Sequence, residues 1–252
     1  LTTSGILKQI PSFSLYRRTS SLVSHPTTQG VSLRGTGASG SSRTLVLLDG
    51  VPHNDPFGNH VYWSKIPILQ IEKIEVAEGG LSNLYGSSAM SGVVNIVTKQ
   101  SKRNDLEIKG QVGLRGIGDL EVFSQRRWGR LGLALGGRVF RIGGYKIVQL
   151  DQRGPVDVKA NSKHQIFNWR LDYTLSPRIN FFTNGRVFHE DRNNGTLLQR
   201  NSTKETYLGG GVRGRTSDED SWRVNVFSHI QVFDSHFSRV ALDRQSESLA
   251  LF

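Results

Sequence analysis

From about residue 105 onward, apolar and polar side chains alternate over segments of roughly ten residues. Along 167–175 every second residue is apolar, and Asn168, Arg170 and Asp172 stand between them. A strand of this kind has one apolar face and one polar face, which suits a wall between hydrocarbon and a wet interior. A soluble sandwich also alternates, but it rarely carries Arg, Asp, Asn and Gln along the second face of every strand. The pattern therefore predicts antiparallel transmembrane β-barrel strands.

We predict eight such strands, over residues 105–115, 118–127, 131–142, 164–175, 179–190, 203–215, 221–234 and 240–252. The joints between them alternate in length, with short ones at 128–130, 176–178 and 216–220 and long ones at 143–163 and 191–202. Short turns at one end and long loops at the other are typical of outer-membrane barrels. The joint at 115–118 is short where a long one is due. Aromatic residues near strand ends are expected at the lipid interface, namely Trp128, Tyr173, Trp222 and Phe233.

Residues 1–100 follow a different pattern of short, mixed elements separated by glycines. Thr3 or Ser4 is expected to cap a helix that runs to Ile10 and is stopped by Pro11. The predicted strands of this part are Val31–Arg34, Leu45–Asp49, Ile71–Glu78 and Val93–Thr98. The fold class that follows is a small α+β domain over 1–100, followed by barrel strands over 101–252.

The composition excludes several classes of protein. There are no cysteines, so disulfide scaffolds and thiol nucleophiles are absent. The net charge of +11 invites a nucleic-acid interpretation. The basic residues, however, are spread singly along alternating segments, so solvated strand faces are the better explanation and no nucleic-acid partner is expected. No run of about 18 apolar residues is present to form a transmembrane helix.

Two further motifs carry little weight. Gly35, Gly37 and Gly40 match the dinucleotide fingerprint, but that motif should open a helix inside a βαβ unit, and only Ser41 to Thr44 separate it from the next strand. His53, Asp55 and His60 lack a recognised metal-ligand spacing. We expect no catalytic residue, no metal and no cofactor, and the chain is not expected to be an enzyme.

Four stretches of the first hundred residues resemble the plug domain of TonB-dependent outer-membrane receptors. They are ILKQIPSFSLYR (6–17), VSLRG (31–35), LVLLDGVP (45–52) and IEKIEVAEGGLSNLYGSSAMSGVVNIVTK (71–99). The sequence departs from the family pattern at Lys73, where Arg is common, at Glu78-Gly79-Gly80, where Arg-Gly-Pro is common, and at Pro11-Ser12, where Pro-Gly is usual. These departures affect local charge pairing.

The resemblance implies two groups of site residues. The segment after Asp49-Gly50 resembles an apical plug loop that faces the ligand, which makes ligand-facing candidates of His53, Asn54, Asp55, Phe57, His60, Tyr62 and Trp63. Tyr62 and Trp63 could equally pack on the plug core. A second apical loop is expected over 18–29. The plug motif, including charge pairing between plug and barrel, is expected to involve Arg34, Gly35, Asp49, Gly50, Glu72, Lys73, Glu75, Gly79, Tyr85, Gly86, Gly92 and Asn95. Glu72 and Glu75 lie on opposite strand faces, so at most one of them can point to Arg34 or Lys73.

Geometry also predicts the size of the whole barrel. Eight strands enclose little more than their own side chains, whereas plugged transporters use about 22 strands. We therefore expect a fragment with about eight of 22 strands, lacking the N-terminal coupling segment, and a C-terminal Phe252 that is coincidental. The resemblance implies TonB-dependent import of a large scarce nutrient, such as a ferric siderophore or cobalamin, across the Gram-negative outer membrane. The expected partners are a TonB-type inner-membrane protein, outer-membrane lipid and an extracellular small molecule. A passive barrel or adhesin without energy coupling remains the alternative, and a soluble nucleic-acid binder a weaker one.

Overall fold

The computed structural model describes residues 2–15, 19–35, 42–217 and 220–250. The chain divides into two compact units, Leu1–Thr98 and Lys99–Phe252, each described by itself below. Gly37 and Gly40 of the glycine motif, Arg18 of the second expected apical loop, and Phe252 lie outside the described residues.

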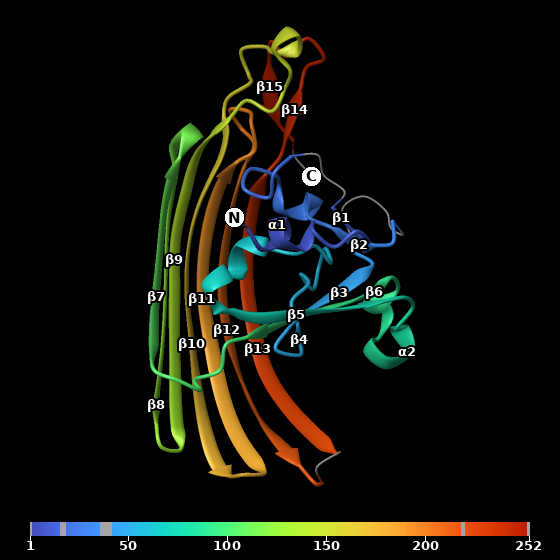
Figure 1. Cartoon of the computed structure of the whole chain (residues 1–252). Helices are drawn as coiled ribbons and strands as arrows, with labels where there is room; N and C mark the ends of the chain where they lie inside the picture. Colours follow the sequence, from blue (N-terminus) through green and yellow to red (C-terminus); the bar gives the residue numbers. More distant parts are fainter. Residues whose placement is uncertain (1, 16–18, 36–41, 218–219, 251–252) are drawn as a thin grey trace. The chain divides into compact units, whose positions relative to one another are not determined.

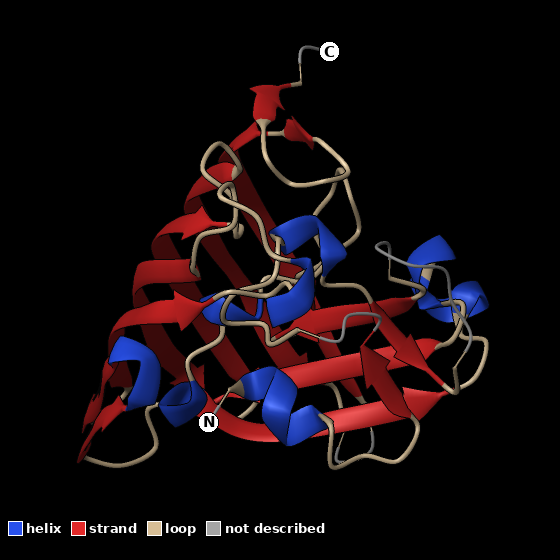
Figure 2. Cartoon of the chain, turned by 90° about the horizontal axis from the view of Figure 1, so that it is seen from above, coloured by secondary structure: helices blue, strands red, loops and turns tan. Residues whose placement is uncertain are grey.

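The first unit, which we call the plug unit, contains short elements joined by turns (Figures 1 and 2). Its helices are α1 (Thr3–Leu7), η1 (Pro26–Thr28), η2 (Trp63–Lys65), η3 (Ile68–Gln70), α2 (Ser82–Tyr85) and η4 (Ser87–Ala89). Its strands are β1 (Phe13–Leu15), β2 (Val31–Leu33), β3 (Thr44–Leu48), β4 (Val51–Pro52), β5 (Ile71–Glu78) and β6 (Gly92–Thr98). The predicted strands are therefore present, and β5 has the predicted bounds.

A four-stranded sheet in the order β4-β3-β6-β5 forms the centre of the plug unit. Strands β3 and β6 are parallel, while β5 pairs with β6 and β4 with β3 in antiparallel fashion. Strands β1 and β2 form a separate antiparallel pair. Apolar side chains from several elements form one buried core, which includes Leu7, Val31, Leu33, Val46, Val94 and Ile96. Burial of apolar surface, at roughly 25 cal/mol per Å², stabilises this unit in the manner of a soluble domain.

The predicted start and end of the first helix were wrong. Thr2 is the N-cap, and its side chain accepts a hydrogen bond from the Gly5 amide. A cap must lie outside the helical backbone with its oxygen free to reach the first turn, and Thr2 has the required extended conformation. Thr3 instead donates to the Ile66 carbonyl and is buried. The helix ends at Leu7, well before Pro11.

Three residues with positive φ lie at the ends of β3 and β6. Asp49 and Gly50 have φ angles of 53° and 81°, the left-handed values that a tight type I′ hairpin turn requires. Asp49 then accepts hydrogen bonds from the Thr98 amide at 2.9 Å and the Thr98 hydroxyl at 2.6 Å. Gly92, at φ 142°, begins β6 where any Cβ would lie 2.4 Å from the Ala77 carbonyl oxygen. Only glycine fits there.

The second unit contains one seven-stranded antiparallel meander, which we call the wall. Its seven strands are β7 (Asp105–Gly113), β8 (Ile117–Trp128), β9 (Leu131–Tyr145), β10 (Ala160–Ser176), β11 (Ile179–Asn193), β12 (Arg200–Arg215) and β13 (Ser221–His236). They lie side by side in chain order (Figure 1). Within the described residues β7 and β13 do not pair, so the sheet is open and the barrel is not closed. A single turn of 3-10 helix, η5 (Leu114–Gly116), makes the short joint between β7 and β8.

The predicted eighth strand, 240–252, was wrong. The chain after β13 forms a small hairpin of β14 (Ser238–Val240) and β15 (Glu247–Leu249). The polar run Asp243–Ser246 makes the turn, in which Arg244 has a left-handed φ of 57° and its amide donates to the Ala241 carbonyl. A turn residue of this conformation cannot continue a strand. A further short helix, η6 (Leu150–Gln152), lies in the loop between β9 and β10.

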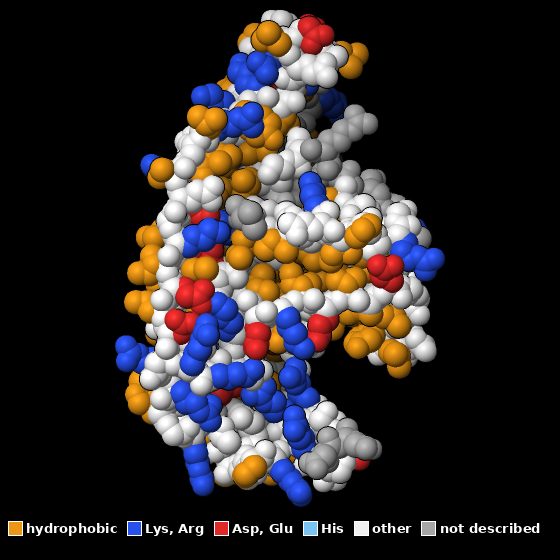
Figure 3. Space-filling model, in the orientation of Figure 1, with side chains coloured by type: hydrophobic (Ala, Val, Ile, Leu, Met, Phe, Trp, Pro, Cys, Tyr) orange, Lys and Arg blue, Asp and Glu red, His pale blue; other side chains and the backbone are white. Residues whose placement is uncertain are grey.

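The wall is apolar on its exposed face and polar on its buried face. Val139, Val187 and Ile230 are 55–66% exposed, whereas Glu121 and Glu190 are at most 1% exposed. Hydrophobic side chains follow the outer edge of the wall in Figure 3. We call the exposed face outward and the buried face inward. The arrangement is that of membrane barrel strands, with hydrocarbon outside and a polar interior.

The aromatic residues at the strand ends divide between the two faces. Trp128, Tyr173 and Trp222 are exposed on the outward face, near the short turns. Phe233 pairs with Thr203, a fully buried inward residue, so its predicted lipid-facing position was wrong. Two residues that face each other across neighbouring strands share one side of the sheet. No helix among the described residues is both long and apolar enough for a membrane span.

Candidate functional site

The loop predicted to face ligand runs from β4 to η2, and Asn54 anchors it to the sheet. The Asn54 side chain accepts from the Val46 amide at 2.7 Å and donates to the Thr44 carbonyl at 3.1 Å. The His53 amide donates to the Val46 carbonyl. The side-chain amide of Asn54 thus takes the place of a strand partner at the edge of β3. This role fixes where the loop leaves the sheet.

Asp55 shapes the tip of the same loop. One carboxylate oxygen accepts from the Phe57 and Gly58 amides at 3.0 and 2.8 Å, a side-chain turn that Asp commonly makes. The Asp55 amide donates to the His60 carbonyl, which closes the loop. As a result the Phe57 side chain projects fully into solvent. A bare aromatic ring on a braced loop can stack on a ligand.

His60 lies beneath that tip, with Nε2 3.8 Å from Asp55 Oδ2. Burial lowers the pKa of His60 below its usual value; the nearby Asp55 opposes this shift, and Lys65 adds to it. His60 also packs on Tyr62, with ring centroids 5.0 Å apart, and Lys65 Nζ lies 4.1 Å above the Tyr62 ring. The loop is thus supported by a buried aromatic and cationic stack.

The seven predicted ligand-facing residues therefore differ in exposure. Phe57 is fully exposed, and His53 and Asn54 are partly buried. The remaining four are buried, namely Asp55, His60, Tyr62 and Trp63. Trp63 makes an edge-on contact with Phe13 in the plug core, at 6.1 Å between ring centroids. Their contact with ligand stays a prediction, with Phe57 the best-placed residue.

The predicted charge cluster of the plug motif is brought together in part. Lys73 donates to Glu75 at 2.5 Å, and Asn95 donates to the other Glu75 oxygen at 2.9 Å. The hydrogen bond with Glu75 raises the pKa of Lys73, and that with Lys73 lowers the pKa of Glu75. Glu72 is on the opposite face of β5, and exposed Arg34 lies beyond β2 at a left-handed φ of 59°. Pairing of Arg34 across to the barrel stays a prediction.

The other plug-motif residues occupy turns. Gly79 follows β5, and Gly86 lies between α2 and η4; both have positive φ. Tyr85, at the end of α2, is half exposed. Gly35 follows Arg34 with φ 67°. Within the described residues, no three His, Cys, Asp or Glu side chains are grouped as a metal site would require.

The inward face of the wall carries buried ion pairs. Arg138 binds Asp119 through two hydrogen bonds of 2.8 Å, and Arg192 binds Glu190 in the same way. Glu205 accepts from Arg186 at 2.6 Å. Paired in this geometry, buried charges can remain ionised. The alternation predicted polar residues on this face, but not their partners.

Sequence reasoning missed a cluster that ties three joints together at the long-loop end of the wall. Arg244, in the β14–β15 turn, forms a two-pronged ion pair with Asp157 of the β9–β10 loop. Glu247 accepts from Thr196 and from the Leu198 amide of the β11–β12 loop. The pair with Arg244 lowers the pKa of Asp157, and the hydrogen bonds from Ser238 and Thr196 lower that of Glu247 despite burial, which acts to raise it. No local pattern could reveal these contacts, because up to 87 residues separate the partners.

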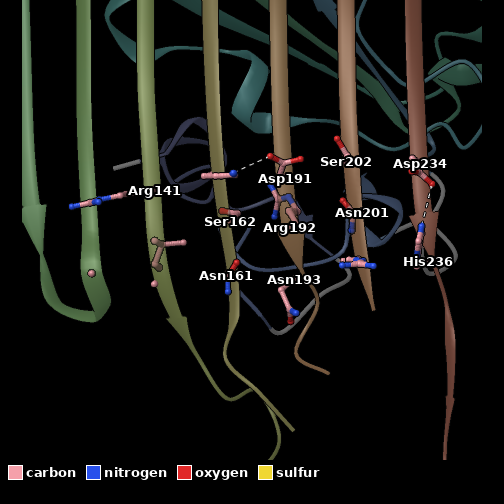
Figure 4. A pocket seen from close by; sticks show the side chains of 15 residues that line it. Arg141, Asn161, Ser162, Asp191, Arg192, Asn193, Asn201, Ser202, Asp234 and His236 are labelled. Atoms are coloured by element: carbon pink, nitrogen blue, oxygen red, sulfur yellow. Dashed lines mark ion pairs between the residues drawn. The ribbon is translucent and has the colours of Figure 1, made fainter. Parts of the chain in front are cut away.

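A polar groove of about 660 Å³ lies near the same end of the wall (Figure 4). Its labelled side chains come from the neighbouring strands β9 to β13, and two ion pairs are visible, Lys163 with Asp191 and Asp234 with His236. The predicted strands included Arg141 and Asp234 but stopped short of His236 and of the groove residues on β10, β11 and β12. The strands continue because backbone pairing extends past the last apolar position, to Asn161↔Asn193 on β10 and β11.

Residues 1–93 match the family described as TonB-dependent Receptor Plug Domain. Over these residues the chain belongs to the plug-domain family of TonB-dependent receptors. The sequence resemblance is thereby confirmed, as is the fold of a plug domain followed by part of an antiparallel barrel. Such receptors reside in the outer membrane, where this chain is therefore placed.

Two relatives illustrate how far this similarity extends. The "Iron-regulated outer membrane virulence protein" of Vibrio cholerae is 29% identical over 212 residues, covering 77% of this chain and 29% of the relative. The "Vitamin B12 transporter BtuB" of the same species is 34% identical over 89 residues, 35% of this chain and 13% of that protein. This chain thus spans less than a third of the length of these two relatives.

Solved structures share the fold at low identity. The siderophore receptor PirA from Pseudomonas aeruginosa superposes with a TM-score of 0.62 at 18% identity, covering 94% of this chain and 41% of that one. The copper transporter OprC gives a TM-score of 0.68 at 16% identity, covering 96% and 36%. Both units of this chain therefore have counterparts in the folds of these two proteins.

Proposed function

We propose that the complete protein imports a large, scarce nutrient through the outer membrane, with residues 1–100 as the gate of a barrel that begins at residue 101. The observation that carries the proposal is the pairing of two opposite burial patterns in one chain. A domain with an apolar core is followed by a sheet that turns its apolar side chains outward. The first suits a water-filled lumen and the second suits lipid.

We further propose that the loop over residues 53–63 meets the ligand first, through Phe57. Its tip is braced by Asp55 and its base by Asn54. A loop held in one conformation loses little entropy when it binds. The joints tied by Asp157, Arg244 and Glu247 form a second candidate contact surface for the ligand.

Energy coupling to a TonB-type inner-membrane protein is part of the proposal, and the ligand class remains open. The named relatives and neighbours include an iron-regulated protein, a vitamin B12 transporter, a siderophore receptor and a copper transporter. Each of these names suggests a scarce metal or a metal complex as the cargo of this protein too.

The test is uptake by cells that express the full-length protein as their one importer. Labelled ferric siderophores, cobalamin and copper are offered in turn, with and without a protonophore. Accumulation of one of them that stops when the proton gradient is collapsed would support the proposal. Accumulation that is unchanged by the protonophore would indicate a passive barrel. No accumulation of any probe would count against import of these cargoes.

A second measurement concerns the loop. Phe57→Ala is expected to weaken binding of the transported probe roughly tenfold, the value of a stacked aromatic contact. Leu84→Ala is the matched control, because Leu84 is also well exposed on the plug unit but lies in α2. Equal effects of the two changes would remove the special role of Phe57.

A further inference from the structure

The outward face of the wall changes character at one level across five strands. Below that level it is apolar, with Phe167, Val187 and Ile230 each about half to two-thirds exposed. Four residues further along each strand the outward positions are polar, and the row between them is mixed, with Val139 and Val232 among its members. Arg141, Lys163, Asp191, Ser202 and Asp234 pair in sequence from β9 to β13 and so form one row.

The rows on either side extend this polar surface. Lys204 lies one row nearer the apolar belt, opposite His189, and Arg200 lies one row farther, opposite Asn193 and His236. We call the charged residues of these rows the polar rim: Arg141, Lys163, Asp191, Arg200, Lys204 and Asp234. They are outward by strand alternation, and their four basic side chains are exposed.

Positive charge exceeds negative charge on the rim. Lys163 and Asp191 are 3.3 Å apart, and Asp234 lies 3.7 Å from His236. In the described part of the chain, Arg141, Arg200 and Lys204 are in no ion pair. Three cationic side chains are therefore left beside a lipid-facing surface without a protein carboxylate.

The height of the apolar belt places the rim relative to the bilayer. From Leu131 to Arg141 the outward residues of β9 span ten steps of about 3.3 Å, or about 33 Å along the strand, and a strand tilt of about 40° reduces this to about 25 Å of height. Outer-membrane barrels carry an apolar band of about 25 Å. The rim thus begins where hydrocarbon ends, at the level of lipid headgroups. Lys and Arg bind phosphate oxygens through charge-assisted hydrogen bonds.

We propose that the polar rim binds the phosphate groups of a phosphorylated glycolipid in the outer leaflet of the membrane. The proposal rests on the proposed function for one point, namely that the long-loop end of the wall faces outward from the cell. The short-turn end has a different outward border, formed by Trp128, Tyr173 and Trp222. Arg126, Arg130 and Arg178 are exposed at that end and provide a matched control.

The test measures binding of bisphosphorylated lipid A to the detergent-purified full-length protein. The rim variant is Arg141→Gln, Arg200→Gln, Lys204→Gln, and the control is Arg126→Gln, Arg130→Gln, Arg178→Gln. Each basic residue near an anionic lipid surface contributes on the order of 5-fold in affinity. We expect the rim variant to bind at least about 20-fold more weakly and the control to change less than about 3-fold.

Three results would overturn the assignment: dephosphorylated lipid A binding as tightly, phosphatidylglycerol binding as tightly, or equal losses in the two variants. Both variants are first compared with the wild type by thermal unfolding. If the rim variant is unfolded, Arg141→Lys, Arg200→Lys, Lys204→Arg replaces it. Retained affinity in this charge-conserving variant would support the proposal, and its loss would contradict it. Nutrient uptake is measured in parallel. If lipid A binding depends on the rim but no nutrient is taken up, only the transport proposal is contradicted. If nutrient is taken up but lipid A binding does not depend on the rim, only the rim proposal is contradicted.

Discussion

The two units of this chain solve the burial problem in opposite ways. In the plug unit Val46, Val94 and Ile96 are fully buried, as in any soluble domain. In the wall it is Glu121 and Glu190 that are buried, while apolar side chains cover the exposed face. The positions of the apolar side chains therefore do not show which face of the wall is inward unless it is known whether water or lipid surrounds the sheet. The comparison teaches that strand alternation fixes two faces, and that the surroundings decide which face lies inside.

The largest expected effect concerns a buried ion pair on the inward face of the wall. Asp119→Ala leaves Arg138 buried without its carboxylate and is expected to cost about 3–5 kcal/mol of unfolding free energy. The double change Asp119→Leu, Arg138→Leu should cost much less, because no charge is then left unpaired. Thermal unfolding of the full-length protein in lipid bilayers measures both. Equal costs would mean that this face is wet and its charges screened.

The next effect tests the outward face. Leu208 is 55% exposed in the middle of the apolar belt. Leu208→Arg should cost about 2–4 kcal/mol, the value for a cation at the bilayer midplane. Gln165→Arg, outward but next to the polar rim, should cost about 0–1 kcal/mol. The fraction of folded receptor recovered from outer membranes reports the difference, and similar yields for the two variants would contradict a lipid-facing belt.

A smaller effect is expected in the plug unit, where ordinary hydrogen-bond energetics apply. Asp49→Ala removes the acceptor of two hydrogen bonds from Thr98 and should lower the local opening free energy by about 1–2 kcal/mol. Asp49→Asn is the control, since Asn tolerates the left-handed backbone and keeps one acceptor. Hydrogen exchange of the Thr98 amide in the full-length protein gives the comparison. An unchanged exchange rate in the Ala variant would show that the hydrogen bonds between Asp49 and Thr98 do not stabilise the turn.

The smallest effect is a pH dependence at His60. Its pKa is lowered in the folded protein, so below about pH 6.5 the unfolded chain takes up a proton that the folded chain does not. The stability of the 53–63 loop should therefore fall as the pH drops, by at most about 1 kcal/mol between pH 7.5 and 5.5. Hydrogen exchange, corrected for its intrinsic pH dependence, measures this. His60→Gln should abolish the dependence; its persistence would implicate another group.

The sequence predicted those parts of the fold that depend on local pattern. Alternation located the wall strands, and β5 was predicted with its full bounds. The sequence pattern began the predicted strand for β10 at His164, because Lys163 and Asn161 resemble loop residues. In the structure the backbone pairing of β10 continues through these residues, beyond the apolar belt. Predicted strand 240–252 failed for the opposite reason, since apolar residues on both sides of Asp243–Ser246 suggested continuity across a turn.

The site was less predictable than the fold. The family motif indicated the 53–63 loop, but not that the Asn54 side chain would bond to the backbone of β3 and the Asp55 side chain to the loop's own backbone. Lys73 and Glu75 share a strand face, so their contact was within reach of sequence reasoning. The Asp157–Arg244 pair was not, because it depends on how three joints fold over one another.

The central claim is that the wall's exposed apolar face meets lipid. The 252 residues contain no cysteine. Single cysteines are therefore placed along β10 in a cysteine-free version of the full-length receptor in its native membrane. Those at Phe167, Trp169 and Leu171 should react with a lipid-soluble maleimide and resist a charged one, while one at Lys163 should react with both. Equal labelling of the first three positions by the charged reagent, or protection from both reagents, would contradict the account.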